Sequence, residues 1–183
     1  MTTTRSFDVL HHFSEDPSIT RFVPHVPATN PEHRPAVWAI DVDHAPLYWF
    51  PRDCPRVTVW PRSAGGRTHF TSWFLTSADR LHAIETGWLS RVRDVELYLY
   101  DLPGEPFSPW ADARGQWIAE DEVVPLRVEP VGDLLALHAE AEIELRVMPD
   151  LWPLIDAVVD GAATGDWDFS IVRKHLARPR RPG

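Results

Sequence analysis

Two neighbouring histidines near the start of the chain are the first residues that could do chemistry. His11 and His12 are followed by Glu15 and Asp16, and imidazole and carboxylate groups are ligands of zinc and manganese. Successive residues of a strand point to opposite faces, so the two rings cannot reach one ion unless the strand bends. Scattered surface histidines explain the same pattern. We therefore expect no metal site, and a metal-dependent hydrolase remains an alternative.

The single cysteine is the second candidate for chemistry. Cys54 lies between Arg52 and Arg56, and guanidinium groups can lower the pKa of a thiol and raise the fraction of reactive thiolate. A cysteine hydrolase with His12 or His44 as the base is the chemistry that this pattern allows, while packing at a tight corner is the structural alternative. One cysteine also excludes an intramolecular disulfide and a multi-cysteine zinc site.

An aromatic stretch, residues 36–60, carries the strongest local signal. Each tryptophan N–H and the tyrosine hydroxyl needs a polar partner when it is buried, whereas a plain core is built from Leu, Ile and Val. This composition favours the wall of a cleft. The rings are Trp38, Tyr48, Trp49, Phe50 and Trp60.

The two arginines of this stretch have a second possible role. The planar forks of Arg52 and Arg56 suit phosphate or carboxylate groups. Both residues follow the first rings of the stretch, where the pyrophosphate of a nucleotide could lie. Pairing with Asp41, Asp43 or Asp53 to hold the corner is the alternative.

Short elements without a regular alternation of strands and helices predict an α+β fold. The eighteen prolines interrupt long helices and central strands, and Gly65-Gly66 predicts a turn over residues 63–67. Residues 1–176 are expected to form a single domain, and residues 177–183 a basic, disordered tail. We predict strands at residues 7–13, 36–40, 57–60, 69–75, 95–100, 116–124, 126–131 and 142–147. Helices are predicted between the N-cap Ser77 and the C-terminal Gly87, and at residues 133–140 and 151–160.

Charge and hydropathy exclude several classes of function. The formal net charge of −9 argues against a general nucleic-acid binder, whose long-range field should be positive. No segment has the apolar length of a signal peptide or of a membrane span, which needs roughly 20 residues. We therefore expect a cytoplasmic protein that does not bind membranes.

Two resemblances add to these observations. The blocks LHHFSEDPSI, VWAID, YWFPRDCPRV and ELRVMPDLWPL resemble an uncharacterised family of small bacterial proteins, which implies no activity. More remotely, Leu10–Ser14, Val37–Asp41 and Ala45–Tyr48 resemble the first two motifs of the ADP-ribosyltransferase superfamily, especially its poly(ADP-ribose) polymerase-like branch. That resemblance implies two small antiparallel or mixed sheets that form a cleft, and NAD as the cofactor.

The same resemblance implies roles for four residues. His12 would bind the ribose hydroxyls of NAD, and Ser14 would stand where the superfamily binds the nicotinamide carboxamide. Trp38 and Tyr48 would be the two rings that enclose the nicotinamide. The chain departs from the superfamily pattern because Phe13 replaces a glycine and because Trp38 replaces a tyrosine.

The catalytic position departs further. In GQWIAEDEVVPLRV, Gln116 stands where the superfamily has a glutamate that assists transfer. Glutamine cannot carry the negative charge that stabilises an oxocarbenium-like ribose, and loss of one such group can cost roughly 10²–10³ in rate. Glu120, Glu122 or Glu144 could supply the charge from elsewhere. We therefore expect an NAD- or nucleotide-binding protein with weak or absent transferase activity, and a non-enzymatic protein- or ligand-binding module is the main alternative.

Overall fold

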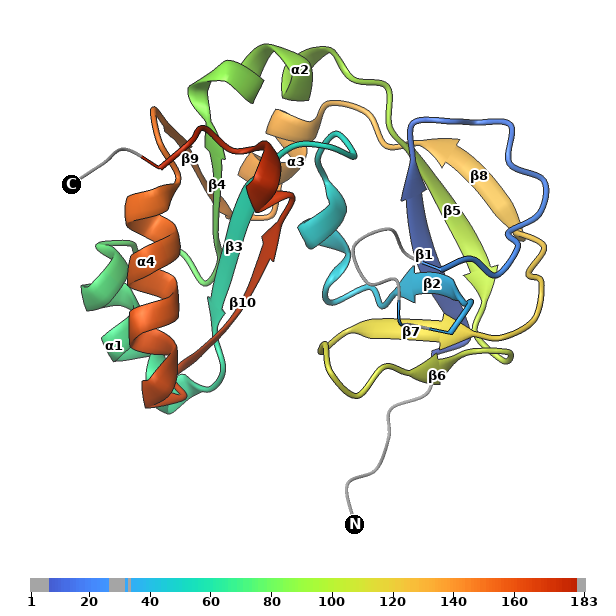
Figure 1. Cartoon of the computed structure of the whole chain (residues 1–183), viewed down its shortest axis with the longest axis horizontal. Coiled ribbons are helices and arrows are strands. Elements are labelled where there is room, and N and C mark those ends of the chain that lie inside the picture. Colours follow the sequence, from blue (N-terminus) through green and yellow to red (C-terminus); the bar gives the residue numbers. More distant parts are fainter. Residues whose placement is uncertain (1–6, 27–31, 33, 181–183) are drawn as a thin grey trace. The chain divides into compact units, whose positions relative to one another are not determined.

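The computed structural model describes residues 7–26, 32 and 34–180. The chain divides into two compact units, each assembled from two separate segments. The first unit contains Met1–Trp49 and Glu96–Gly132, and the second contains Phe50–Val95 and Asp133–Gly183. Each unit has its own sheet, and the helices are few and short (Figure 1). The predicted α+β class is confirmed.

The first unit is built on a six-stranded sheet with the order β6-β7-β2-β1-β5-β8. All of its strand pairs are antiparallel. A short 3₁₀ helix, η1 (Ala45–Tyr48), follows β2. The strands are β1 (Val9–Ser14), β2 (Val37–Ile40), β5 (Tyr98–Pro103), β6 (Ser108–Pro109), β7 (Gln116–Ala119) and β8 (Arg127–Pro130).

One face of this sheet forms the core of the first unit. Leu10 and Tyr100 are fully buried there, together with alternate residues of the neighbouring strands. Phe22 covers this face, and its backbone pairs with that of Val123. Because side chains alternate along each strand, the intervening residues project from the other face of the sheet.

The second unit is built on a four-stranded sheet with the order β10-β3-β4-β9. Its strands are β3 (Arg56–Pro61), β4 (Leu81–Glu85), β9 (Glu144–Met148) and β10 (Trp167–Val172), and only the β4–β9 pair among them is parallel. The α-helices are α1 (Ala64–Phe74), α2 (Leu89–Asp94), α3 (Leu134–Glu140) and α4 (Trp152–Gly161). The 3₁₀ helices are η2 (Thr86–Trp88), η3 (Ala162–Thr164) and η4 (Lys174–Leu176).

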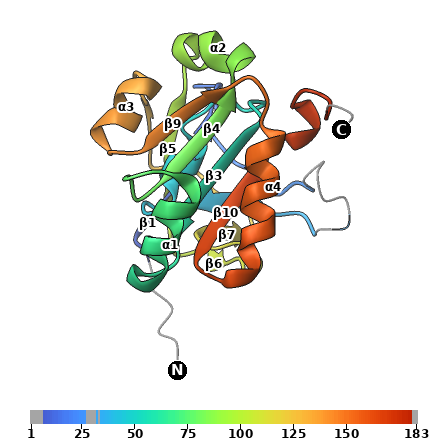
Figure 2. The ribbon, with the colours of Figure 1, turned by 90° about the vertical axis from the view of Figure 1, so that its left-hand side faces the viewer.

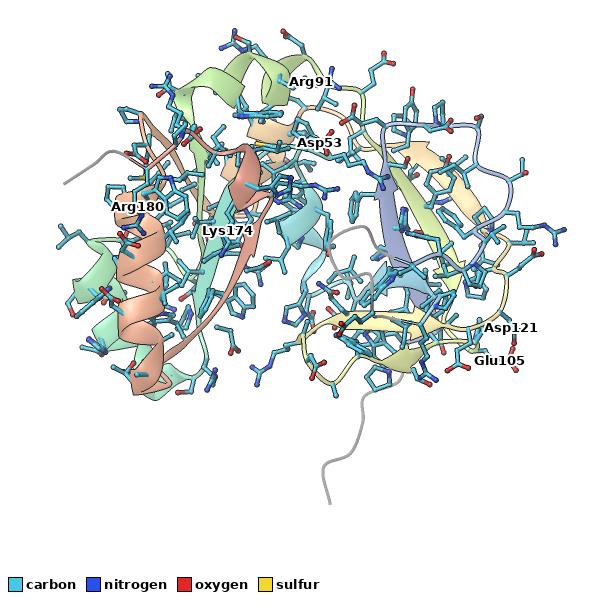
Figure 3. All side chains as sticks on the ribbon, in the orientation of Figure 1. Asp53, Arg91, Glu105, Asp121, Lys174 and Arg180 are labelled. Atoms are coloured by element: carbon cyan, nitrogen blue, oxygen red, sulfur yellow. The ribbon has the colours of Figure 1, made fainter. Side chains whose placement is uncertain are left out.

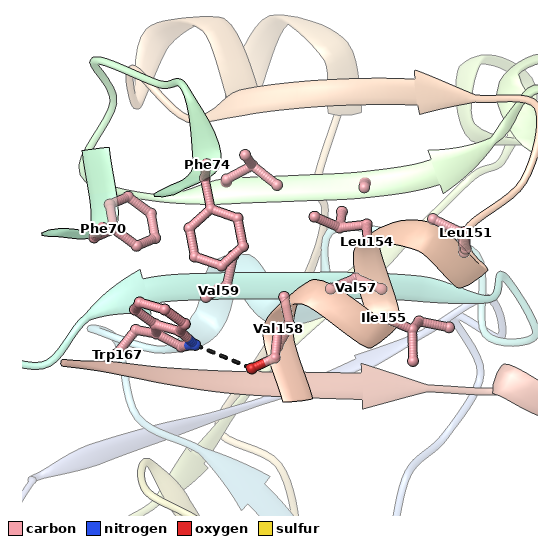
Figure 4. Close-up of a cluster of buried hydrophobic side chains, with 11 residues drawn as sticks. Val57, Val59, Phe70, Phe74, Leu151, Leu154, Ile155, Val158 and Trp167 are labelled. Carbon is pink, nitrogen blue, oxygen red and sulfur yellow. Dashed lines mark hydrogen bonds between the residues drawn. The ribbon is translucent and has the colours of Figure 1, made fainter. Parts of the chain in front are cut away.

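Helices α1 and α4 cover one face of this sheet (Figure 2). Phe74 of α1 and Val158 of α4 pack with Val59 of β3 in a continuous apolar cluster (Figure 4). Trp167 of β10 closes the cluster, and its indole N–H donates to the Val158 carbonyl oxygen at 3.2 Å. The buried tryptophan thereby obtains the polar partner that it needs.

Two adjacent elements differ from the prediction. Residues 63–75 were expected to form a turn and a strand, but they form the N-cap and body of α1, because the Ser63 hydroxyl accepts from the Gly66 amide at 3.2 Å. The segment between Ser77 and Gly87 was expected to be helical, but Leu81–Glu85 is the strand β4, all of whose residues are buried. Periodicity alone cannot separate a fully buried strand from a buried helix.

The basic segment at the C-terminal end makes defined contacts as far as Arg180. The backbone amide of Arg178 donates to both carboxylate oxygens of buried Glu85, each at 3.1 Å. The Arg180 guanidinium pairs with the Asp156 carboxylate of α4 at 2.6 and 3.0 Å, and Figure 3 shows Arg180 beside that helix. The remainder of the predicted tail, residues 181–183, lies outside the described residues.

No helix in the described part of the chain has the length and apolar character that crossing a membrane requires.

Candidate functional site

The second face of the six-stranded sheet carries most of the predicted site. Trp38 lies opposite Ile118, and Ile40 lies opposite Gln116 in the β2–β7 register. His11 lies opposite Ile40 in the β1–β2 register, so β1 presents His11 and Phe13 on this same face. We call Phe13, Trp38, Tyr48, Trp110 and Gln116 the aromatic face.

Tyr48 links two strands of the aromatic face. Its ring is stacked on that of Phe13, with 6.4 Å between the ring centroids and 5° between the planes. Its hydroxyl accepts from the Gln116 side-chain amide at 3.2 Å. Trp38 meets Trp110 edge to face at 5.6 Å. All five residues are half-buried.

The turn before Tyr48 and the loop before Gln116 support one another. The Asp41 carboxylate accepts from the His44 backbone amide at 2.9 Å and bonds the His44 ring at 2.7 Å, which fixes the start of η1. The Gly115 carbonyl accepts from the Asp41 amide at 2.9 Å. Gly115 has a φ of +82°, and a Cβ there would lie 2.3 Å from the His44 ring. Only glycine fits at this position, which precedes Gln116 directly.

His12 does not join the aromatic face. It alternates with Leu10 on the core side of β1, lies opposite buried Tyr100, and has its ring centroid 4.7 Å from that of Phe22. Its Nδ1 donates to the Trp38 backbone carbonyl at 2.9 Å. The expected convergence of the His12 side chain with Trp38, Tyr48 and Gln116 is therefore not found, because β1 turns its two histidines to opposite faces of the sheet.

Ser14 also lies on the core side of β1 and is buried. Its hydroxyl accepts from the Asp16 backbone amide at 3.1 Å and closes the turn after the strand. The Asp16 carbonyl in turn accepts from the Tyr100 hydroxyl at 2.6 Å. The contacts thus give Ser14 a structural role in the turn, in place of the carboxamide contact that the resemblance implied.

Arg52 and Arg56 belong to the second unit. Arg56 is buried, donates to the Cys54 carbonyl at 3.2 Å, and lies 5.3 Å from the centre of the Phe50 ring. Arg52 is exposed, and its carbonyl accepts from Arg173 at 3.5 Å. Arg56 therefore supports the corner before β3 through the Cys54 carbonyl and the Phe50 ring, while the pairing with Asp41, Asp43 or Asp53 stays a prediction.

Cys54 is fully buried in the second unit. Burial raises the pKa of its thiol to about 12, an effect that outweighs the opposite influence of the Arg56 charge. The thiolate is the nucleophilic form, so the flanking arginines do not produce a reactive cysteine. Among the described residues, no group of three or more His, Cys, Asp or Glu side chains is arranged to hold a metal ion.

Sequence reasoning gave His11 only a possible metal-binding role. In the structure its Nδ1 lies 3.1 Å from an Asp101 carboxylate oxygen, on the face that carries Phe13 and Gln116. The signal that could have found it is the period of two along β1, which must place one histidine of the pair on each face.

Comparison with known proteins places the chain in a family. The model of a family of unknown function, DUF6886, matches residues 11–177. The chain belongs to this family. No curated protein and no solved structure matches it. In this DUF6886 protein the match covers most of both units and every candidate site residue.

Proposed function

We propose that this DUF6886 protein binds a ligand with a planar heteroaromatic ring, of which the nicotinamide part of NAD is the leading candidate, and that it has little or no transferase activity. The observation that carries the proposal is the stacked pair of Phe13 and Tyr48, joined to the amide of Gln116. Aromatic rings stack on flat ligands, and an amide beside them can pair with the polar edge of the ligand.

The polar chemistry of Gln116 fits a carboxamide. Its side-chain nitrogen donates to the Tyr48 hydroxyl at 3.2 Å, and its carbonyl oxygen is the atom that would accept an N–H from the ligand. Trp38 shares this face and supplies a further half-buried ring. An ADP-ribosyltransferase-like organisation of the first unit is part of the proposal, since Trp38, Tyr48 and Gln116 keep the order of that superfamily's motifs.

Two features argue against efficient transfer. Gln116 is neutral, so the charge that would stabilise an oxocarbenium-like ribose is missing at this place, at a cost of roughly 10²–10³ in rate. His12 lies on the opposite face of the sheet from Tyr48. Binding without turnover is the behaviour that this combination supports best.

Calorimetric titration tests the proposal. We expect saturable binding of nicotinamide and NAD, and weaker or no binding of ADP-ribose, which lacks the nicotinamide ring. Tyr48→Ala should lose the binding because it removes both the stacked ring and the partner of Gln116. Phe169→Ala, which removes an exposed ring of the second unit, is the matched control and should bind normally. If neither nicotinamide nor NAD binds the wild-type protein, the proposal is wrong.

A further inference from the structure

A row of side chains crosses five strands of the first sheet. Gln116 lies opposite Ile40 and Ile40 lies opposite His11. His11 lies opposite Asp101, and Asp101 lies opposite Arg127. Residues that are directly opposite in a sheet point to the same side, so the row places His11 on the aromatic face, between Gln116 and a charged pair.

Asp101 holds the His11 ring in a defined orientation. One carboxylate oxygen lies 3.1 Å from His11 Nδ1, and the other accepts from Arg127 Nε at 3.2 Å. The His11 and Asp101 side chains are 16% and 18% exposed, so water does not dominate the contact. A carboxylate can only accept a hydrogen bond, so the neutral ring keeps its proton on Nδ1 and its lone pair on Nε2.

We propose that His11, oriented by Asp101, is a ligand-binding residue of the aromatic face and accepts a hydrogen bond from a ligand hydroxyl through Nε2. His11 and Phe13 are two positions apart on one strand, so their side chains lie about 7 Å apart. The ligand class is therefore a planar ring compound with a hydroxyl at about that distance from the ring. This inference rests on the proposed function, because Phe13 and Tyr48 define where the ring lies.

The neighbours of His11 differ on its two sides. Asp101 faces it from β5, while Arg127 and Glu129 face it from β8 and are paired with each other at 2.8 Å. From β2 the opposite residue is uncharged Ile40. The His11 ring therefore has a charged carboxylate on the β5 side and an apolar neighbour on the β2 side.

The test compares two probes in matched variants. His11→Ala should weaken NAD binding about three- to tenfold, the effect of one neutral hydrogen bond, and should leave nicotinamide, which has no hydroxyl, unchanged. Unchanged nicotinamide binding also shows that the variant is folded. Asp101→Asn should slow acylation of His11 by diethyl pyrocarbonate, measured by mass spectrometry without any ligand.

The possible outcomes separate the two proposals. If the wild-type protein binds neither NAD nor nicotinamide, the proposed function and this inference are both overturned. Normal wild-type binding with undiminished NAD affinity in His11→Ala would overturn this inference alone. So would a His11 ring that stays unmodified while exposed His175 is acylated, because Nε2 would then be inaccessible.

Discussion

Lowering the pH should destabilise the second unit through two buried histidines, His82 of β4 and His138 of α3. His138 Nδ1 lies 2.6 Å from the Leu134 carbonyl, which can only accept, so this nitrogen carries a proton. His138 Nε2 then accepts from His82 Nδ1 at 3.0 Å. His82 Nε2 is left with a bare lone pair, buried and without a hydrogen-bond partner among the described residues.

This arrangement disfavours the charged form of both rings. Burial, the His138 ring and the charges of Arg80 and Arg56 hold the pKa of His82 well below the ordinary value of 6.5. Burial also lowers the pKa of His138, and its hydrogen bond to Leu134 opposes that effect in part. Both rings are therefore neutral in the folded protein at pH 7.

The sign of the effect follows from proton binding. Below pH 6.5 the unfolded chain protonates these histidines and the folded protein does not, so the free energy of unfolding falls as the pH falls. At about pH 5.5 an ordinary histidine stabilises the unfolded state by about 1.4 kcal/mol. We expect a loss of about 1.4 kcal/mol from His82 between about pH 7.5 and 5.5, and up to the same amount again from His138.

Urea unfolding at the two pH values measures this loss. A double variant, His82→Leu with His138→Leu, replaces both partners by apolar groups and should lose less stability on acidification than the wild type, by about 1.4–2.8 kcal/mol. The His–Asp contacts elsewhere are common to both proteins and cancel in the difference. His175→Gln, at an exposed position, should behave as the wild type. An equal loss in wild type and double variant would refute the reasoning.

Three further predictions concern backbone conformation, the cysteine and the C-terminal segment. Gly115→Ala should lower the free energy of unfolding by at least about 1–2 kcal/mol, the cost of its positive φ, and should weaken nicotinamide binding. In the control variant Gly87→Ala a Cβ meets no atom within 4 Å, so stability and nicotinamide binding should both be unchanged. Native protein should resist iodoacetamide near neutral pH because the pKa of Cys54 is about 12, and modification without urea would contradict this. Truncation after Ala177 removes the amide that binds buried Glu85 and should lower the free energy of unfolding by about 1–3 kcal/mol, whereas an unchanged melting temperature would show that this contact is weak.

Much of the secondary structure was predictable where local signals agree. Asp133 caps α3 as expected, since its carboxylate accepts from two backbone amides of the first turn. The alternating pattern before Met148 and the apolar stripe of α4 likewise predicted β9 and that helix. The failure at β4 comes from the burial of all five of its residues, which erases the periodicity that distinguishes helix from strand. At α1 only Gly66, Phe70 and Phe74 are buried, at helical spacing, and the Gly65-Gly66 pair was interpreted as a turn instead.

The site could be predicted only in part. The order of motifs indicated Trp38, Tyr48 and Gln116, which share a face. Choosing between His11 and His12 requires knowing which side of β1 is buried, and β1 carries apolar residues on both sides, such as Leu10 and Phe13. The pairing register of β1 with β5 determines which of the two histidines faces the core. This register is established only in the folded sheet.

The division into two units was also hidden from the sequence. One boundary falls between Trp49 and Phe50, within the aromatic stretch that was interpreted as one wall of a cleft. Its five rings therefore belong to different units, three to the first and two to the second. Pro46, Pro51 and Pro55 surround this boundary, but the aromatic residues between them do not have the polar composition that usually marks a linker.

The interrupted connectivity of both units has a consequence for how the protein is made. Strand β1 leaves the ribosome well before its partner β5, which begins at Tyr98, more than 80 residues after β1 ends at Ser14. Until β5 is made, one edge of β1 has no strand to pair with. Because each unit is assembled from two separate segments, neither unit can be expressed alone by truncating the chain at one end. Closing such distant pairings is slow, so the nascent chain should depend on chaperones.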